Sequence, residues 1–176
     1  MAIHGWCAGQ SARRAKKGAQ DEAVGPNPTD RAKPGVKRHL LVEGKGVPLS
    51  VTITGANTPD MCQTGDVLDG IVVVRPDPAL LPQHLCQDKG YDYQASRQAV
   101  YEHGYTLPIP PKGLDTTVPP LGDPARHPAR RWVVERAHGW LHRFRKILVR
   151  YERHACTYLG LLQFACALIV ARKLLG

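Results

Sequence analysis

Residues 36–54, VKRHLLVEGKGVPLSVTIT, contain two apolar runs on either side of a glycine-rich tetrapeptide. The first run is Val36–Val42, and the second, Val47–Thr54, is enriched in β-branched residues that favour strands. The intervening Glu43–Gly46 has the composition of a tight turn. This segment therefore predicts a β-hairpin.

The chain that follows the hairpin alternates between helical and extended patterns. Six prolines between residues 110 and 128 exclude regular structure there. Helices separated by short strands predict an α/β fold, in which a helical crossover places two strands parallel. The expected elements are a helix at 59–68, a strand at 85–87, a helix at 93–103 closed by Gly104, a strand at 106–109, and helices at 129–149 and 155–175.

The first 35 residues are rich in Gly, Ala, Lys and Arg and contain three prolines, so we expect irregular chain there. Residues 36–176 then form one folded domain. We see no leader peptide at the start, and the apolar stretch 155–171 is short for a membrane span, which needs about 20 apolar residues. Five scattered cysteines without zinc-ligand spacing are typical of free thiols. We therefore expect a cytoplasmic protein without a membrane partner.

The charge distribution favours a polyanionic partner such as DNA. The formal net charge is +9 and the sequence pI is about 9.6. Residues 125–153 carry nine Lys and Arg against Glu135 and Glu152, a net charge of +7. The segment from residue 46 to 124 is acidic on balance, so the basic surface is expected to come from the two ends of the chain.

Glu135 stands nearly alone as an acid in a basic helical segment, residues 131–146. Steps of three and four residues place Arg131, Glu135, His138, His142 and Arg145 on one helix face. The opposite stripe is apolar and suits the core. Two interpretations remain open from this pattern: an acid that binds a metal within a phosphate-binding face, or an ordinary surface with weak ion pairs.

Asp88 follows a short apolar strand and precedes Lys-Gly-Tyr. The carboxyl ends of strands are where sites form in open α/β sheets, although Asp-Lys-Gly is also ordinary turn chemistry. Together with Glu135, Asp88 could hold divalent ions, because oxygen-only ligands favour Mg²⁺ or Mn²⁺ and paired carboxylates support two-metal phosphoryl transfer. Such a site normally needs a third acid.

Six motifs in order give the chain a family resemblance from about Arg14 to Leu174. It resembles the C-terminal catalytic half of bacterial insertion-sequence transposases of the DDE type. The motifs are GPNPTDR at 25–31, KRHLLV at 37–42, GVPL at 46–49, TGAN at 54–57, DKGYD at 88–92 and RWVVER at 131–136.

The resemblance implies a ribonuclease-H-like mixed sheet flanked by helices, two bound Mg²⁺ or Mn²⁺ ions, and DNA strand cleavage and transfer at the ends of an insertion sequence. By position, Asp88 would be the second catalytic acid and Glu135 the third, both binding metal, and a homo-oligomer on DNA is expected. The residues expected to contact DNA are Arg131, His138, His142, Arg143, Arg145 and Lys146.

The chain departs from the family pattern at the first catalytic Asp, which would fall near Ala8 or Gly9. We therefore expect a degenerate or missing first strand, as in a truncated copy, and impaired cleavage. Asp30 and Glu43 are alternative acids for a nuclease with a different ligand set, although both lie in turn sequences. A third interpretation is a non-catalytic DNA-binding protein that uses the basic helix 129–149.

Overall fold

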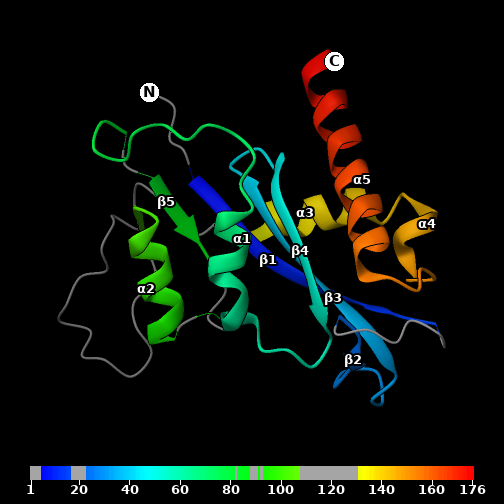
Figure 1. Cartoon of the computed structure of the whole chain (residues 1–176). Coiled ribbons are helices and arrows are strands. Elements are labelled where there is room, and N and C mark those ends of the chain that lie inside the picture. The colour runs from blue at the N-terminus through cyan, green and yellow to red at the C-terminus, as the bar shows by residue number, and fades with distance from the viewer. Residues whose placement is uncertain (1–4, 17–22, 82, 88–90, 92, 108–130) are drawn as a thin grey trace.

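One mixed sheet with helices on both faces forms the molecule (Figure 1). The computed structural model describes residues 5–16, 23–81, 83–87, 91, 93–107 and 131–176. The strands are β1 (Gly5–Arg14), β2 (Gly25–Pro26), β3 (Pro34–Glu43), β4 (Pro48–Gly55), β5 (Gln83–Cys86) and β6 (Tyr105–Thr106). The helices are the 3₁₀ turn η1 (Asp60–Gln63), α1 (Thr64–Asp69), α2 (Gln94–Glu102), α3 (Arg131–Leu141), α4 (Arg145–Leu148) and α5 (Ala155–Leu175).

Strand β1 lies at the centre of the sheet, in the order β2-β3-β1-β5-β6, with β4 also paired to β3. It pairs antiparallel with β3 and parallel with β5. The prediction that residues 1–35 are irregular, with the first strand degenerate or missing, is therefore wrong for residues 5–14. This segment has few strong strand formers, but two neighbouring strands satisfy its backbone groups, and tertiary context overrides weak propensity.

The predicted hairpin is confirmed as β3 and β4. Their antiparallel register runs from Val36 opposite Gly55 to Val42 opposite Pro48, with a bulge between Leu41 and Val42. Gly46 adopts φ +88° in the turn, a conformation that favours glycine.

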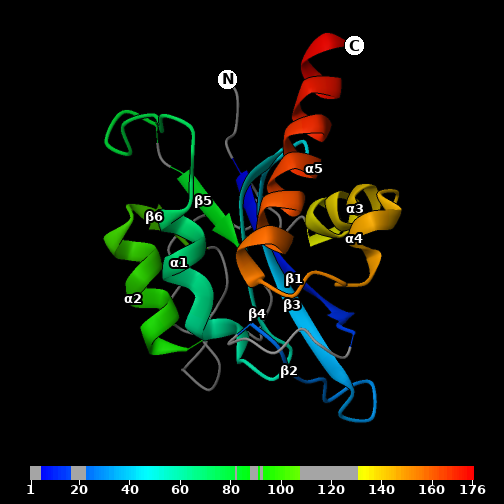
Figure 2. The same cartoon turned by 45° about the vertical axis from the view of Figure 1, so that its right-hand side comes forward.

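Two layers of helices enclose the sheet, with α1 and α2 on one face and α3 and α5 on the other (Figure 2). The α3/α5 face holds the larger core, which includes Val36, Leu40, Val133, Ala137, Leu141, Tyr158 and Leu162. The α1/α2 face holds Leu41, Leu49, Val67, Leu85, Val100 and Tyr105. Strands β1, β5 and β6 run parallel, and the α/β class, with a ribonuclease-H-like arrangement of sheet and helices, is confirmed.

The long basic helix expected at 129–149 is two helices. Helix α3 ends at Leu141, and Phe144 takes the extended backbone angles φ −87° and ψ 94° before α4 begins. Gly139 weakens the last turn of α3, because glycine costs about 1 kcal/mol relative to alanine in a helix. The break turns Ile147 into the core and places Arg145 and Lys146 on a different element from Glu135.

Helix α5 is long and apolar enough to cross a membrane by length and composition, with a mean hydropathy of 1.6 over its most apolar window. The core helix of a soluble protein can meet the same test. One stripe of α5 packs onto the sheet through Tyr158, Leu162, Ala165 and Ile169. Its other face is exposed, including Phe164.

Candidate active site and basic surface

Strand β1 and helix α3 meet at Gly9. A Cβ atom on this glycine would lie 2.7 Å from Cγ1 of Val134, so a helix side chain already fills the space above this strand position. Successive strand residues face opposite sides of a sheet, and Ala8 accordingly packs in the core beneath α1. Of the two positions expected for the family's first acid, Gly9 is the one that faces the helix carrying Glu135.

Glu135 is exposed on α3, one residue after Val134. No hydrogen bond or ion pair joins its carboxylate to another residue in the described part of the chain. The surface pair with His138 that the helical spacing allows is not formed, because His138 lies inside the protein. The Glu135 carboxylate is therefore exposed to solvent and has no partner among the described side chains.

Two other expected site residues lie outside the described structure. Asp88 comes two residues after Cys86, the end of β5, and is not among the described residues. Arg131 begins α3, but its side chain is not among those that the structure describes. Among the residues that are described, no group of three His, Cys, Asp or Glu side chains could hold a metal.

The structure places His138 and His142 between α3 and the sheet. His138 is 6% exposed, and among the described residues neither ring nitrogen makes a hydrogen bond of normal geometry, although the Gly9 backbone beside the ring opposes part of its pKa shift. Burial and the nearby Arg38 lower the pKa of His138 to about 4, so its ring is neutral at pH 7. His142 is half-buried, with Nδ1 3.2 Å from Nη2 of Arg13, and burial together with that guanidinium lowers its pKa. At pH 7 the buried His138 presents no positive charge to DNA.

Arg38 is fully buried beneath α4 and α5, a feature that the sequence reasoning missed. Its Nε donates to the Tyr158 hydroxyl at 3.0 Å and its Nη2 donates to the carbonyl of Ile147, while Nη1 has no partner among the described residues. The Tyr158 hydroxyl donates to the same Ile147 carbonyl at 2.9 Å. Arg38 stands between Val36 and Leu40 on the inward face of β3, so the period-two pattern of the strand could have revealed its burial.

Arg150 also has a structural role, although it counts toward the basic C-terminal region. It is fully buried, and its guanidinium donates to the backbone carbonyls of Ala23, Glu152 and Arg153. Its backbone N–H donates to the carbonyl of Arg14 at 2.9 Å. Charge counted from the sequence therefore overstates the charge available at the surface.

Three of the expected DNA-contacting residues remain exposed: Arg143, Arg145 and Lys146. Arg143 lies in the turn after α3, and the other two lie on α4. Lys146 forms an ion pair with Glu152 at 3.3 Å. The two alternative acids, Asp30 and Glu43, both stabilise turns. The Asp30 carboxylate forms an ion pair with the Lys33 ammonium at 3.3 Å, and the Glu43 carboxylate accepts hydrogen bonds from backbone N–H groups of the hairpin.

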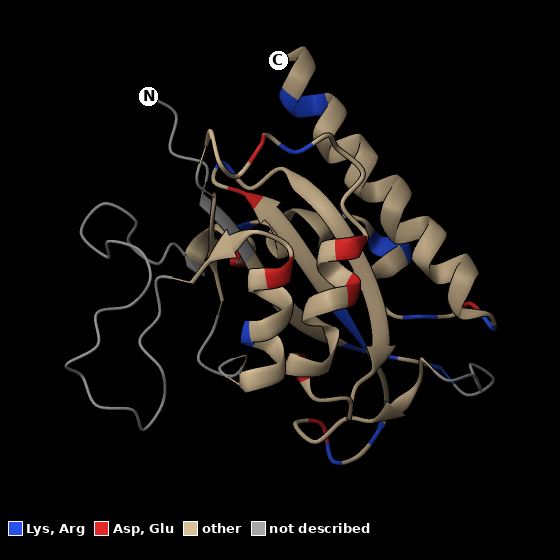
Figure 3. Ribbon diagram, turned by 60° about the vertical axis from the view of Figure 1, so that its left-hand side comes forward, with Lys and Arg blue, Asp and Glu red and all other residues tan. Residues whose placement is uncertain are grey.

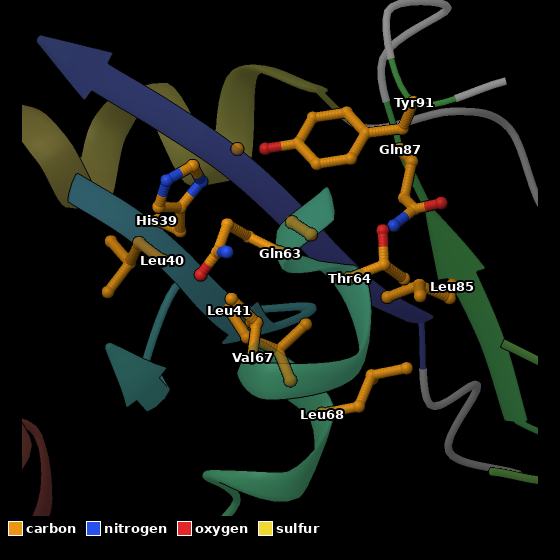
Figure 4. Close-up of a pocket in the computed structure, with 12 residues that line it drawn as sticks. His39, Leu40, Leu41, Gln63, Thr64, Val67, Leu68, Leu85, Gln87 and Tyr91 are labelled. Carbon is orange, nitrogen blue, oxygen red and sulfur yellow. The ribbon is translucent and has the colours of Figure 1, made fainter. Parts of the chain in front are cut away.

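A small hollow lies on the opposite face of the sheet, between His39 of β3 and Thr64 of α1 (Figure 4). The His39 Nε2 atom lies 2.8 Å from the Thr54 hydroxyl, and Nδ1 has no partner in the part of the chain that the structure describes. Burial and then Lys37 lower the pKa of His39 to about 4. The described residues that line the hollow include no carboxylate.

Comparison with known proteins identifies the family. Residues 9–170 match the family described as the transposase DDE domain. A Burkholderia cepacia protein assigned as the transposase for insertion sequence element IS402 is 38% identical over 149 residues, which cover 83% of this chain and 67% of that protein. The match extends from Gly9 on β1 through Val170 on α5, so it includes the sheet and both helical layers. The chain belongs to the DDE transposase-domain family of insertion-sequence transposases.

Proposed function

We propose that this domain acts in DNA transposition at the ends of an insertion sequence, and that it binds DNA but cleaves it poorly. Family membership and the net charge of +9 support a role on DNA. The observation that carries the impairment is Gly9, which offers no carboxylate at the strand position facing α3. The site of action is the cytoplasm, and a homo-oligomer assembles on the DNA.

The catalytic acids that we propose are Asp88 and Glu135. Strands β1 and β5 run parallel with Cys7 opposite Cys86. In the sequence, Gly9 follows Cys7 by two residues and Asp88 follows Cys86 by two residues, and this equal spacing supports the assignment of the two positions to the first and second acids. Glu135 follows Val134, the residue that covers Gly9.

DDE transposases generally use divalent metal ions, and we propose Mg²⁺ or Mn²⁺ for this chain. Asp88 and Glu135 would be the ligands, and the metal would activate the attacking oxygen and stabilise the leaving one. Gly9 supplies no side-chain ligand, and Val134 lies 2.7 Å from the place of a Cβ atom at this position, so it also crowds any longer side chain there. The residues present therefore do not fit a complete two-metal centre.

The impairment is tested by rebuilding the site. We expect the natural chain to bind Mn²⁺ weakly in calorimetry and to leave supercoiled plasmid intact. Gly9→Asp combined with Val134→Ala should raise the Mn²⁺ affinity at least about tenfold, the effect of roughly 1.4 kcal/mol of added ligation. Glu135→Gln in that background should remove the gain. Metal-dependent nicking by the natural chain, abolished by Glu135→Gln, would show that the site is already complete.

The second candidate function is DNA binding without catalysis. Exposed Arg143 and Arg145, together with the missing acid at position 9, favour it. In this case DNA affinity should fall steeply with salt and be indifferent to Mg²⁺. Metal binding that fails in both the natural and the rebuilt chain, with DNA binding retained, would select this function over an impaired enzyme.

A further inference from the structure

Aromatic rings and cations alternate across the outer surface of α3 and α5. The Arg136 guanidinium lies 4.7 Å from the centroid of the Trp132 ring and 5.1 Å from that of Trp140. The Lys173 ammonium lies 4.7 Å from the Trp140 centroid. We call these four residues the cation–π ladder. A cation over an aromatic face is attracted by the ring quadrupole, so each ring restrains the cations beside it.

The ladder is also fixed to the sheet. Nη2 of Arg136 donates to the carbonyl of Lys45 at 2.6 Å, in the turn that joins β3 and β4. Gly46 in that turn lies directly under the ladder, because a Cβ atom there would be 3.2 Å from the Arg136 guanidinium and 3.4 Å from the Trp140 ring. The ladder therefore joins α3, α5 and the hairpin into one surface.

A groove adjoins the ladder between α3 and α5. Its described lining carries three cations and no carboxylate. Arg143, Arg172 and Lys173 are all exposed, and none of the three forms an ion pair with a described carboxylate. In Figure 3, Lys and Arg mark the C-terminal part of α5, whereas α1 carries only acidic charged residues and α2 carries one Arg and one Glu. The lining residues are Trp140, Arg143, Phe144, Ile169, Arg172 and Lys173.

We propose that this groove binds the sugar–phosphate backbone of DNA. This proposal rests on the proposed function of DNA binding. It assigns that binding to a surface outside the helix face that was predicted around Glu135. Three cations without a neighbouring carboxylate match a row of phosphates. The ladder restrains Lys173 before binding, so less side-chain freedom is lost when a phosphate docks. The half-buried Trp140 and Phe144 offer apolar contact to the sugars.

The test is a salt titration of DNA affinity by fluorescence anisotropy, with a labelled duplex of arbitrary sequence. The main variant combines Arg143→Gln, Arg172→Gln and Lys173→Gln, and the charge-conserving variant combines Arg143→Lys, Arg172→Lys and Lys173→Arg. Each phosphate contact contributes about 0.9 to the slope of log affinity against log salt. The neutral triple variant should therefore have a slope that is smaller in magnitude by about 2.7, and the charge-conserving variant should have the slope of the natural chain.

A control for nonspecific loss of charge is Arg97→Gln on α2, across the sheet from the groove. We expect Arg172→Gln to reduce the slope by about 0.9 and Arg97→Gln to leave it unchanged. A folded neutral triple variant with the natural slope would overturn the groove assignment while leaving DNA binding elsewhere intact. If the natural chain bound no DNA, the proposed function would fail with it. If the neutral triple variant lost the natural chain's binding to phosphatidylserine vesicles but kept its DNA affinity, the groove would instead be a membrane-binding surface.

Discussion

Acidification should destabilise the fold through His138, which is buried beside the guanidinium of Arg38 and has no carboxylate partner among the described residues. Burial and the positive charge of Arg38 oppose protonation in the folded state and lower the pKa of His138 to about 4, from an ordinary value of 6.5. In the unfolded chain water surrounds the ring, so protonation begins near pH 6.5. The unfolded state therefore binds a proton more readily than the folded state does.

The sign and size of the effect follow from this difference. The stability is fully present above pH 6.5 and falls as the pH is lowered from 6.5 to 4, because protons then bind preferentially to the unfolded chain. One pKa unit corresponds to about 1.4 kcal/mol, so His138 alone removes about 3 kcal/mol over this window. His39 has a similar pKa of about 4 and adds a comparable loss.

The assay is urea denaturation followed by circular dichroism at several pH values between 7 and 4. His138→Gln removes the titrating ring, so the pH dependence of its unfolding free energy should be shallower by about 3 kcal/mol over the window. Any general cost of the substitution appears at all pH values and does not affect this comparison. The matched control is His154→Gln, since His154 is exposed before α5 begins. Equal pH dependence in the natural chain and the His138→Gln variant would refute the reasoning.

Two further predictions concern packing on the α3 face. Gly9→Ala should destabilise the protein by about 1–3 kcal/mol, because its methyl group would overlap Val134. Val134→Ala in the same chain should recover part of the loss. If urea denaturation showed that the unfolding free energy changes of the two substitutions simply add, the contact would be contradicted. Tyr158→Phe should cost about 1–3 kcal/mol of unfolding free energy, because the hydroxyl accepts a hydrogen bond from Arg38 and donates one to the carbonyl of Ile147. A melting temperature equal to that of the natural chain would show that neither bond contributes to stability.

Local patterns predicted those elements that form from adjacent residues. The hairpin of β3 and β4, helix α2 with its Gly104 cap, and helix α5 each follow from propensity and turn chemistry within a short window. Strand β1 could not be found in this way, because Gly, Ala and Arg are weak strand formers and its neighbours come from distant parts of the chain. The motif order identified the family without locating that strand.

The basic helix shows why a face predicted from spacing can mislead about function. Helical steps group Glu135 with His138 and His142, yet only Glu135 is exposed, because the edge of the helix that carries the histidines turns toward β1 and Arg13. Elsewhere on this helix Trp140 lies beside Lys173 of α5, and Arg143, in the turn after α3, lines a groove with α5 residues. Only the packing of α3 against α5 could show that Arg143 shares a groove with Arg172 and Lys173.

Gly9 affects both the chemistry and the packing of this site, whereas a sequence comparison shows only that an acid is missing. It removes a carboxylate from the strand position facing α3, and it also lets Val134 approach the strand backbone closely. A single Gly9→Asp change would return the acid but place its Cβ inside the contact distance of that valine. We therefore expect the single variant to lose stability without gaining full metal affinity, whereas the Gly9→Asp, Val134→Ala variant gains both space and ligand. The missing acid and the close packing of α3 are coupled, so recovery of the site depends on both residues.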